Sequence, residues 1–448
     1  MIEATARDRA LEIAREVGRR TCDRERIARA VAFNRKQTAF PEGAHWSALS
    51  VAQGEVGLAL LLACLDASFP EDGWDRQAHG YLQSAAQSLE GMASPPIGAF
   101  GGLAGLSLVV DLLSRGGTRY RRLQGEIDTA LAKSARDAGE QLHSNVHDLS
   151  VHQFDAISGL AGTAACMLAR QDTDELANAL APVIEALCAV ASVDGLPAWY
   201  TPPERIANPD MRAEFAEGNL NCGLAHGIPG PLAALALAYK AGMHNNGLVE
   251  ERIRGGADWL LAHRVDDAWG TNWPAAIPVA TVGGARRAIL PQEVHAHFGK
   301  PLHPTHAAWC YGSPGVARAL WLAGDALDEP RYRDAALEAV RAICARPWQA
   351  RQISSPTFCH GVSGLAHIVL RFAQDTDLPW LWEASRAMLD MLLELYEPDS
   401  VLGFRAHEPE GRRIDRPGFL DGAPGVAAAL LAFATDRAPC WDRVFLLS

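Results

Sequence analysis

The chain has 448 residues, of which 48% are hydrophobic and 21% are charged, a composition typical of a globular protein. Its 41 basic residues are outnumbered by 53 acidic ones, which gives a formal net charge of −12, and only four of the basic residues are lysines. No basic run is longer than a few residues. This balance excludes nucleic acid and anionic membranes as first candidates for a partner.

The N-terminal segment, residues 1–45, is charged and helix-periodic and lacks the apolar core of a secretory signal. The longest apolar stretches, 57–65 and 426–434, are well short of the roughly 18 residues that cross a membrane. We therefore expect a cytoplasmic protein without a transmembrane helix. The nine cysteines are scattered over the chain, which indicates reduced and mostly buried thiols rather than a disulfide framework.

A repeated motif organises the chain. At seven places a Gly-x-x-Gly opens a run of small and apolar residues. The copies begin at Gly54, Gly102, Gly159, Gly227, Gly312, Gly361 and Gly422. Because the runs are apolar on all sides, they predict buried helices. The segments between them, such as 123–141, 176–190 and 332–345, are amphipathic and predict surface helices.

Alternation of seven buried and seven amphipathic helices predicts an all-α fold, an α/α toroid in which an outer ring of helices wraps an inner ring. We expect one domain over residues 1–448, with 1–45 as a helical segment leading into the first repeat. We attribute the motif glycines to crowding where the seven inner helices begin, and to tight turns. The segment 268–303, rich in Pro, Gly, Trp and His, is expected to be an irregular loop near the functional site.

The residues just before each motif should lie together, because parallel inner helices begin at one mouth of the ring. Three of these positions hold Cys310, Cys359 and His360. Two thiolates and one imidazole make a catalytic type of zinc site, in which a fourth position is left open. We therefore predict one Zn²⁺ per chain, bound by these three residues. The remaining cysteines, including Cys166 and Cys222, are expected to be ordinary buried side chains.

Five segments resemble the serial motifs of the lanthionine synthetase C-like (LanC) family of lanthipeptide cyclases. They are FDAISGLAG (154–162), NLNCGLAHGIPGPLA (219–233), AWCYGSPG (308–315), FCHGVSGL (358–365) and GFLDGAPG (418–425). The resemblance spans all seven repeats and implies an α/α toroid that holds one zinc ion. It also implies a reaction, the addition of a peptide cysteine thiol to dehydroalanine or dehydrobutyrine in the same peptide, which closes a thioether ring.

The chain is similar in length to a stand-alone LanC cyclase, since bifunctional synthetases carry an additional dehydratase portion. The resemblance implies a dehydrated precursor peptide with its leader as the partner, with the cognate dehydratase as a second candidate partner. The reaction agrees with the residues. A thiol is mostly protonated at neutral pH, and coordination to zinc deprotonates it and holds it in place.

Attack on the β-carbon leaves an enolate that needs a proton at Cα. His226, one residue before a motif, is predicted to be the acid or base, and Asp155 is predicted to orient it, as the matching residues do in the family. Tyr311 either donates to the enolate oxygen or packs. His306 stands where the family commonly has an arginine that steadies the enolate, so a titratable cation replaces a permanent one.

Other functions remain as alternatives. A zinc toroid of the prenyltransferase type would need an Asp together with Cys and His in other repeats. A toroidal glycosidase would need two facing carboxylates, for which only Asp155 and Asp421 are candidates, and Asp421 is expected to be a helix cap. A non-catalytic zinc-binding scaffold or peptide-binding partner is a different class. The presence of His226 and Asp155 argues against that class, whereas His306 keeps it open.

Overall fold

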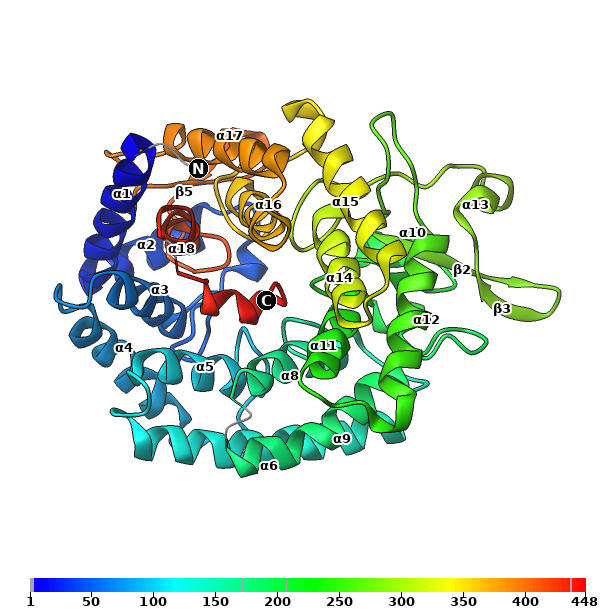
Figure 1. Ribbon diagram of the computed structural model, residues 1–448, viewed down its shortest axis with the longest axis horizontal. Helices are drawn as coiled ribbons and strands as arrows, with labels where there is room; N and C mark the ends of the chain where they lie inside the picture. Colours follow the sequence, from blue (N-terminus) through cyan, green and yellow to red (C-terminus); the bar gives the residue numbers. More distant parts are fainter. Residues whose placement is uncertain (1–3, 171–172, 207, 436) are drawn as a thin grey trace. The chain divides into compact units, whose positions relative to one another are not determined.

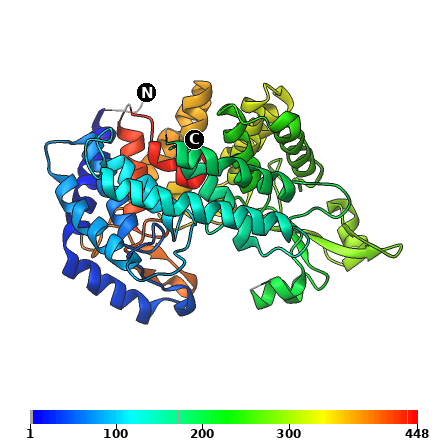
Figure 2. The same cartoon turned by 90° about the horizontal axis from the view of Figure 1, so that it is seen from below.

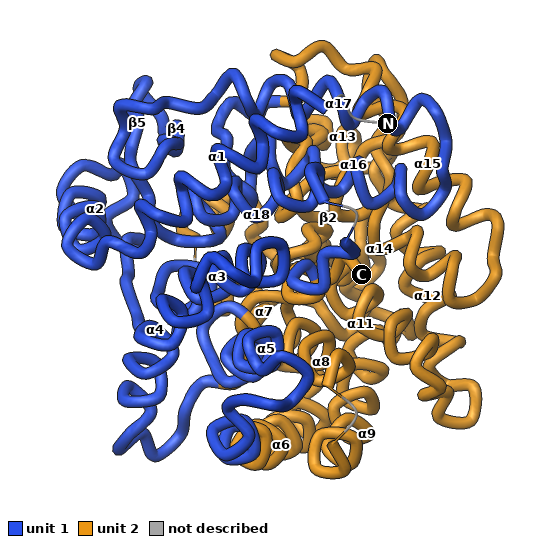
Figure 3. Tube along the Cα trace, turned by 60° about the vertical axis from the view of Figure 1, so that its left-hand side comes forward, with its two compact units in different colours: residues 1–96, 100–127, 352–442 blue, residues 97–99, 128–351, 443–448 orange. Residues whose placement is uncertain are grey.

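Helices dominate the computed structural model, which describes residues 4–170, 173–206, 208–435 and 437–448 (Figure 1). The chain divides into two compact units, each assembled from segments that are distant in the sequence (Figure 3). Unit 1 comprises residues 1–96, 100–127 and 352–442, and unit 2 comprises residues 97–99, 128–351 and 443–448. The expected single domain over 1–448 stays a prediction.

Unit 1 contains four helices that follow a Gly-x-x-Gly motif: α3 (Glu55–Ser68), α5 (Leu103–Leu113), α16 (Val362–Thr376) and α18 (Ala423–Ala434). They pack in a row, with α16 against α18, α18 against α3, and α3 against α5. Each of them also contacts a second helix: α1 (Ala4–Cys22) packs on α18, α4 (Trp74–Leu89) on α3 and, less extensively, on α5, and α17 (Pro379–Glu394) on α16. The unit is completed by α2 (Arg24–Gln37) and a short hairpin, β4 (Ala406–His407) and β5 (Arg413–Ile414).

Unit 2 has the same arrangement around α8 (Leu160–Leu168), α11 (Pro229–Lys240) and α14 (Ser313–Ala326). Helix α11 packs against both α8 and α14, and the second helices are α9 (Asp174–Val190), α12 (Leu248–Ala262) and α15 (Pro330–Ala345). Helix α6 (Arg121–Ser144) begins in unit 1 and continues in unit 2. Three further helices are short: α7 (Val151–Phe154), α10 (Pro209–Glu214) and α13 (Pro291–Phe298). All seven helices that the motifs predict are thus present among the described residues.

Burial follows the two sequence patterns. All nine residues of α8 and all twelve of α18 are buried, as their continuous apolar runs predict. Helix α9 instead buries one face, with Leu176, Leu180, Val183 and Leu187 at helical spacing. Each fully buried leucine or valine contributes about 1.5–3 kcal/mol relative to an exposed one. Within the described residues, no helix combines the length and the apolar content that a bilayer span requires.

The segment 268–303 is not the irregular loop that its composition suggested. It contains β2 (Ala276–Val282), β3 (Ala285–Ala288) and α13, and the hairpin of β2 and β3 is the yellow-green ribbon at the right of Figure 2. Strand β2 also pairs with β1 (Asn219–Asn221), so that a three-stranded antiparallel sheet forms in the order β1-β2-β3. The turn between β2 and β3 is Gly283-Gly284, and both glycines have positive φ angles, of 61° and 86°. Gly-Gly between two apolar runs is a hairpin signal. The expectation of an irregular loop was wrong because the many turn residues of this segment concealed that signal.

The loop before each buried helix folds back over the helix N-terminus. In unit 1 the N–H of Val362 donates to the carbonyl of Ser355 at 2.8 Å, and in unit 2 the N–H of Ile228 donates to the carbonyl of Asn221 at 3.3 Å. These bonds satisfy amides that have no partner within the helix. The motif glycines lie directly under the folded loop, since a Cβ at Gly361 would be 2.3 Å from the Ser355 carbonyl oxygen. The second glycine of a motif can also meet a neighbouring repeat, since a Cβ at Gly315 would be 2.8 Å from the Cβ of Leu224.

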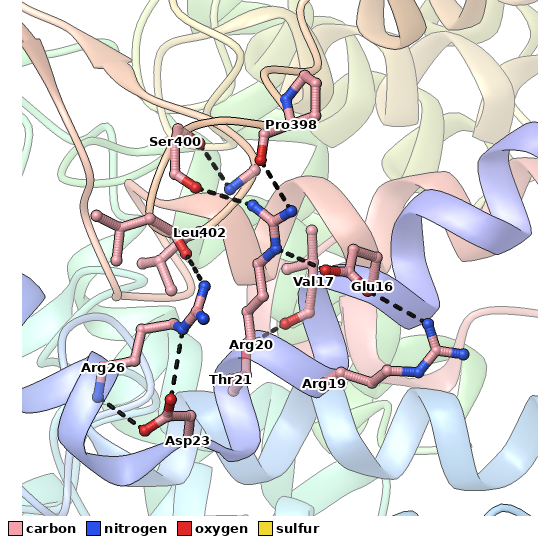
Figure 4. Close-up of polar contacts among 12 residues, drawn as sticks. Glu16, Val17, Arg19, Arg20, Thr21, Asp23, Arg26, Pro398, Ser400 and Leu402 are labelled. Carbon is pink, nitrogen blue, oxygen red and sulfur yellow. Dashed lines mark hydrogen bonds and ion pairs between the residues drawn. The ribbon is translucent and has the colours of Figure 1, made fainter.

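The N-terminal helices of unit 1 are anchored to the loop that follows α17. Arg20 of α1 donates to the carbonyls of Ser400 and Pro398, at 2.9 and 3.0 Å (Figure 4). Its Nε also donates to Glu16 at 2.8 Å, and this bond lowers the pKa of the Glu16 carboxyl. Asp23 caps α2 by accepting the Arg26 amide at 2.9 Å. The segment 1–45 therefore begins as two docked helices, in agreement with its periodicity.

Replacing Gly312 with alanine should destabilise the protein. Its φ angle is +102°, and a Cβ there would be 2.0 Å from the carbonyl oxygen of His306. We expect Gly312→Ala to lower the free energy of unfolding by about 1–3 kcal/mol, as measured by urea denaturation. In the matched control, Gly256→Ala in α12, the new methyl would make ordinary contacts, the nearest at 3.7 Å, and stability should stay equal or rise. Equal stability of Gly312→Ala and the parent would contradict the prediction.

Candidate active site

A buried carboxylate and a histidine meet in unit 2. Asp155 ends α7, and its side chain is fully buried. One carboxylate oxygen, Oδ1, accepts the backbone N–H groups of Ile157, Ser158 and Gly159 at 3.1, 2.7 and 2.8 Å. The other, Oδ2, lies 2.7 Å from Nδ1 of His226, which precedes α11. The backbone therefore fixes Asp155, and Asp155 fixes the ring of His226.

The charge on Asp155 is maintained despite its burial. Burial raises the pKa of this carboxyl, but the hydrogen bonds from His152 and His226 and the charge of His226 outweigh it, so that the pKa is lowered. An ionised Asp155 accepts a hydrogen bond from the protonated Nδ1 of His226. Nε2 is then the ring atom of His226 that can take or give a proton. The His226 side chain is 31% exposed, so this atom can be reached by a substrate.

Tyr311 belongs to the same cluster. Its ring centroid lies 6.3 Å from that of His226, and its hydroxyl accepts a hydrogen bond from Nδ2 of Asn221 at 2.9 Å. Asn221 is the last residue of β1, and its Oδ1 accepts the Gly223 amide at 2.9 Å. The structure thus brings together three of the predicted residues, His226, Asp155 and Tyr311.

Two further residues of this cluster were not predicted. His152 lies on α7, three residues before Asp155, and its Nδ1 is 3.7 Å from Asp155 Oδ2. The spacing His-x-x-Asp within a helix was the available signal, because residues three apart share one face. Asn221 had no such signal, since its place depends on the pairing of β1 with β2.

The predicted metal ligands come from both units. Cys310, in unit 2, is 8% exposed, and its carbonyl accepts the Ala225 amide at 3.2 Å, which fixes it to the loop that bears His226. Cys359 and His360, in unit 1, directly precede Gly361 at the start of α16. The N–H of Cys359 donates to the carbonyl of Leu420 at 3.0 Å. These residue types, two thiols and one imidazole, are ordinary zinc ligands.

Asp421 faces His360 and is not the helix cap that was expected. The N-cap of α18 is Gly422, and no side chain caps this helix. Asp421 Oδ1 instead lies 3.7 Å from Nδ1 of His360, and it is buried without a hydrogen-bond partner among the described residues. The expectation was wrong because the loop's own carbonyl groups already satisfy the first amides of α18, as in the bond from Ala423 N–H to Arg416 at 3.3 Å.

A polar cavity of about 620 Å³ adjoins His360 and Asp421 in unit 1. Arg416 and Glu408 pair on its wall, and Glu408 also accepts the Thr38 hydroxyl at 2.8 Å and the Ala39 amide at 2.6 Å. The cavity is lined by buried polar atoms that have no hydrogen-bond partner in the described chain: Asn34 Oδ1, His407 Nε2, Arg416 Nε and Asp421 Oδ1. Because such atoms are costly to leave unsatisfied, the cavity suits a polar guest.

His306 contributes its backbone rather than its imidazole to the contacts found. Its carbonyl oxygen accepts the Ala308 amide at 3.1 Å and faces Gly312, whereas its Nε2 is buried without a hydrogen-bond partner in the described part of the chain. Among the described residues, no contact of this ring with Asp155, His226 or Tyr311 is found.

The other cysteines do not resemble reactive thiols. None of the nine is in a disulfide; four are buried, four are partly exposed and Cys440 is exposed, so fewer are fully buried than expected. Burial raises the pKa of the Cys166 thiol to about 12 and also raises that of Cys222. Both thiols therefore stay protonated at neutral pH, in agreement with their expected lack of function.

Comparisons with known proteins place the chain in a family. Residues 45–446 match the family described as Lanthionine synthetase C-like protein. The chain belongs to this family. It is also 24% identical over 364 residues to the Nisin biosynthesis protein NisC of Lactococcus lactis subsp. lactis, a match that covers 80% of this chain and 82% of that protein.

A solved structure of a nisin cyclase superposes on the chain with a TM-score of 0.73 at 21% identity, covering 89% of this chain and 92% of that one. This likeness confirms the predicted fold class, the α/α toroid of LanC proteins. Membership confirms the class of enzyme that the motifs indicated, a lanthionine synthetase of the C type. The roles of individual residues stay predictions.

The cavity carboxylate Glu408 should make the stability of this LanC protein depend on pH. Burial raises its pKa, but the bonds from Ala39, Thr38 and Arg416 lower it below the ordinary value of 4.5. Its ionised form therefore stabilises the fold above pH 4.5, and this contribution is lost as the pH falls through the folded-state pKa. We expect Glu408→Gln to lower the unfolding midpoint in urea at pH 7, and the difference from the parent to shrink below pH 4.5. Exposed Glu410→Gln is the control, and an equal effect of both variants at pH 7 would contradict the prediction.

Proposed function

We propose that the chain is a zinc-dependent lanthipeptide cyclase. It adds cysteine thiols of a dehydrated precursor peptide to dehydroalanine or dehydrobutyrine in the same peptide and so forms lanthionine and methyllanthionine rings. The observation that carries this proposal is the Asp155–His226 pair, held at 2.7 Å beside Tyr311 in a chain of the lanthionine synthetase C-like family. A scaffold that only binds peptides would have no need of a histidine with a fixed tautomer and an accessible Nε2.

Cys310, Cys359 and His360 are the residues that would hold the zinc ion. A zinc-ligating histidine usually donates its second ring N–H to a carboxylate or a carbonyl, which fixes the tautomer of the ring. Asp421 Oδ1 suits this task, because it is buried, lacks a hydrogen bond among the described residues and lies 3.7 Å from His360 Nδ1. The donor set and this carboxylate therefore fit the ion. Zinc, when bound, would lower the pKa of the attacking peptide thiol.

His226 moves the proton that the reaction requires. The thiol loses a proton when its sulfur bonds to the β-carbon of the dehydrated residue, and the resulting enolate gains one at Cα. His226 Nε2 takes the first proton and supplies the second, so no other acid or base is needed. Asp155 keeps Nδ1 protonated and stabilises the positive ring between the two transfers.

Tyr311 stabilises the enolate. Its hydroxyl accepts from Asn221, and this orients its own proton toward a different acceptor, for which the enolate oxygen is our candidate. His306, which stands in the place of the usual arginine, is proposed to assist through its imidazole rather than through a permanent charge. The solved relative is named a nisin cyclase, which supports a cyclisation reaction. The 620 Å³ cavity beside His360 would hold the peptide around the reacting cysteine.

The partners follow from this reaction. A dehydrated precursor with its leader must be supplied by a dehydrating enzyme, and the cognate dehydratase is therefore a second proposed partner. A cytoplasmic location stays a prediction.

Metal analysis tests the proposed ligands. We expect about one zinc per chain in the purified protein and loss of most of it in Cys310→Ala and in Cys359→Ala, because each removes a thiolate ligand. Asp421→Asn keeps all three ligands but should weaken zinc binding roughly 10- to 100-fold, which a competition titration with a chromophoric chelator measures. Buried Cys166→Ala is the control and should keep its zinc. Full zinc in both thiolate variants would show that the site is assigned to the wrong residues.

A cyclisation assay tests the proton transfer. His226→Asn should slow ring closure in a dehydrated lanthipeptide precursor by roughly 10²- to 10⁴-fold, the usual contribution of a positioned acid or base, with zinc content unchanged. Because ring closure leaves the peptide mass unchanged, the remaining free thiols are counted by alkylation and mass spectrometry. His244→Asn, an exposed histidine beyond the opposite end of α11, serves as the control. Cyclisation at the parental rate in His226→Asn would refute the assignment.

A further inference from the structure

A second group of potential metal ligands lies in unit 2, apart from the cysteines. His152, Asp155 and His226 each offer one donor atom, and these atoms all lie within 4.8 Å of one another. All three residues belong to unit 2, two on or next to α7 and one before α11. The reaction proposed above uses Asp155 and His226 but assigns no task to His152.

The distances suit a small cation. In a tetrahedral zinc site with bonds of about 2.0–2.2 Å, neighbouring donor atoms are roughly 3.3–3.6 Å apart. Asp155 Oδ2 is 2.7 Å from His226 Nδ1 and 3.7 Å from His152 Nδ1, so the present separations lie on either side of that range. A bound ion would lengthen the first separation and shorten the second.

In this group the backbone fixes Asp155, whereas His152 is exposed and can change its side-chain conformation. The Oδ1 atom of Asp155 is held by three backbone N–H groups, which leaves Oδ2 directed at the two imidazoles. The side chain of His152 is 58% exposed and can therefore rotate toward an ion, whereas that of His226 is 31% exposed. The two rings meet edge to face, with centroids 6.0 Å apart. One carboxylate and two imidazoles, completed by water, are ordinary zinc ligands.

We propose that His152, Asp155 and His226 form a second metal site, which takes Zn²⁺ when the ion is in excess and thereby withdraws His226 from proton transfer. Two thiolates bind zinc more tightly than this set of ligands, so the second site fills only after the cysteine site. Bound metal replaces the proton on Nδ1 of His226 and separates it from Asp155. The binding claim stands on its own, and only the inhibitory consequence rests on the proposed function of the chain.

Zinc binding itself is the first test. Protein that carries one zinc is dialysed against rising Zn²⁺, and the metal is counted per chain. The parent should take up a second zinc, and His152→Gln should weaken this second step at least ~10-fold while the first zinc stays. His147→Gln, an exposed histidine outside the three-residue group, is the matched control and should bind as the parent does. A second zinc that binds equally to the parent and to His152→Gln, or no second zinc in the parent, would overturn the site.

Inhibition is the second test, with each protein compared with its own rate in the absence of added zinc. Excess Zn²⁺ should stop cyclisation of a dehydrated precursor by the parent, and His152→Gln should need at least ~10-fold more zinc for the same effect. Cyclisation at full rate with the second zinc bound would overturn the inhibitory role. If the parent cyclises no peptide at any zinc concentration, the proposed function fails, whereas the dialysis still decides on the site. The two failures are therefore distinguishable.

Discussion

The backbone carbonyl that lies over the start of each buried helix is the constraint on which the chemistry of this protein depends. The folded-back loop satisfies helix amides with its own carbonyls, as between Val362 and Ser355, and it requires glycine where a side chain would collide. The residue just before the first glycine is then held in a turn of fixed shape. His226, Tyr311, His360 and Asp421 all occupy this position, so loops of the same kind present each of them.

Much of this was accessible from the sequence because it is local. A continuous apolar run identifies a buried helix without knowledge of its neighbours, and a repeated motif places the residues before it in equivalent positions. The pairing of Asp155 with His226 could be anticipated from that register, although the two are separated by 71 positions. Crowding between neighbouring helix starts was expected and is found, as between Gly315 and Leu224, and the loop that precedes each helix adds to it.

The features that the sequence did not reveal depend on contacts between distant segments. Asn221 reaches Tyr311 only because β1 pairs with β2, some 55 residues later in the chain. Asp421 has the residue type and position of a helix cap, and only the loop carbonyls that satisfy α18 free it to face His360. His152 differs from these, since its spacing from Asp155 was readable and was overlooked.

The same constraint bears on position 306, where the resemblance to the family led us to expect an arginine and the chain has histidine. The fold uses the carbonyl of His306, which packs against Gly312, and any residue can supply a carbonyl. The side chain is therefore free to change without loss of the helix start. An arginine and a histidine at this position differ in charge. A guanidinium is charged at every accessible pH, whereas a neutral imidazole donates one hydrogen bond and becomes charged only on protonation. Under the proposed function, hydrogen bonds would then stabilise the enolate, and Tyr311, whose hydroxyl accepts from Asn221, is the proposed donor.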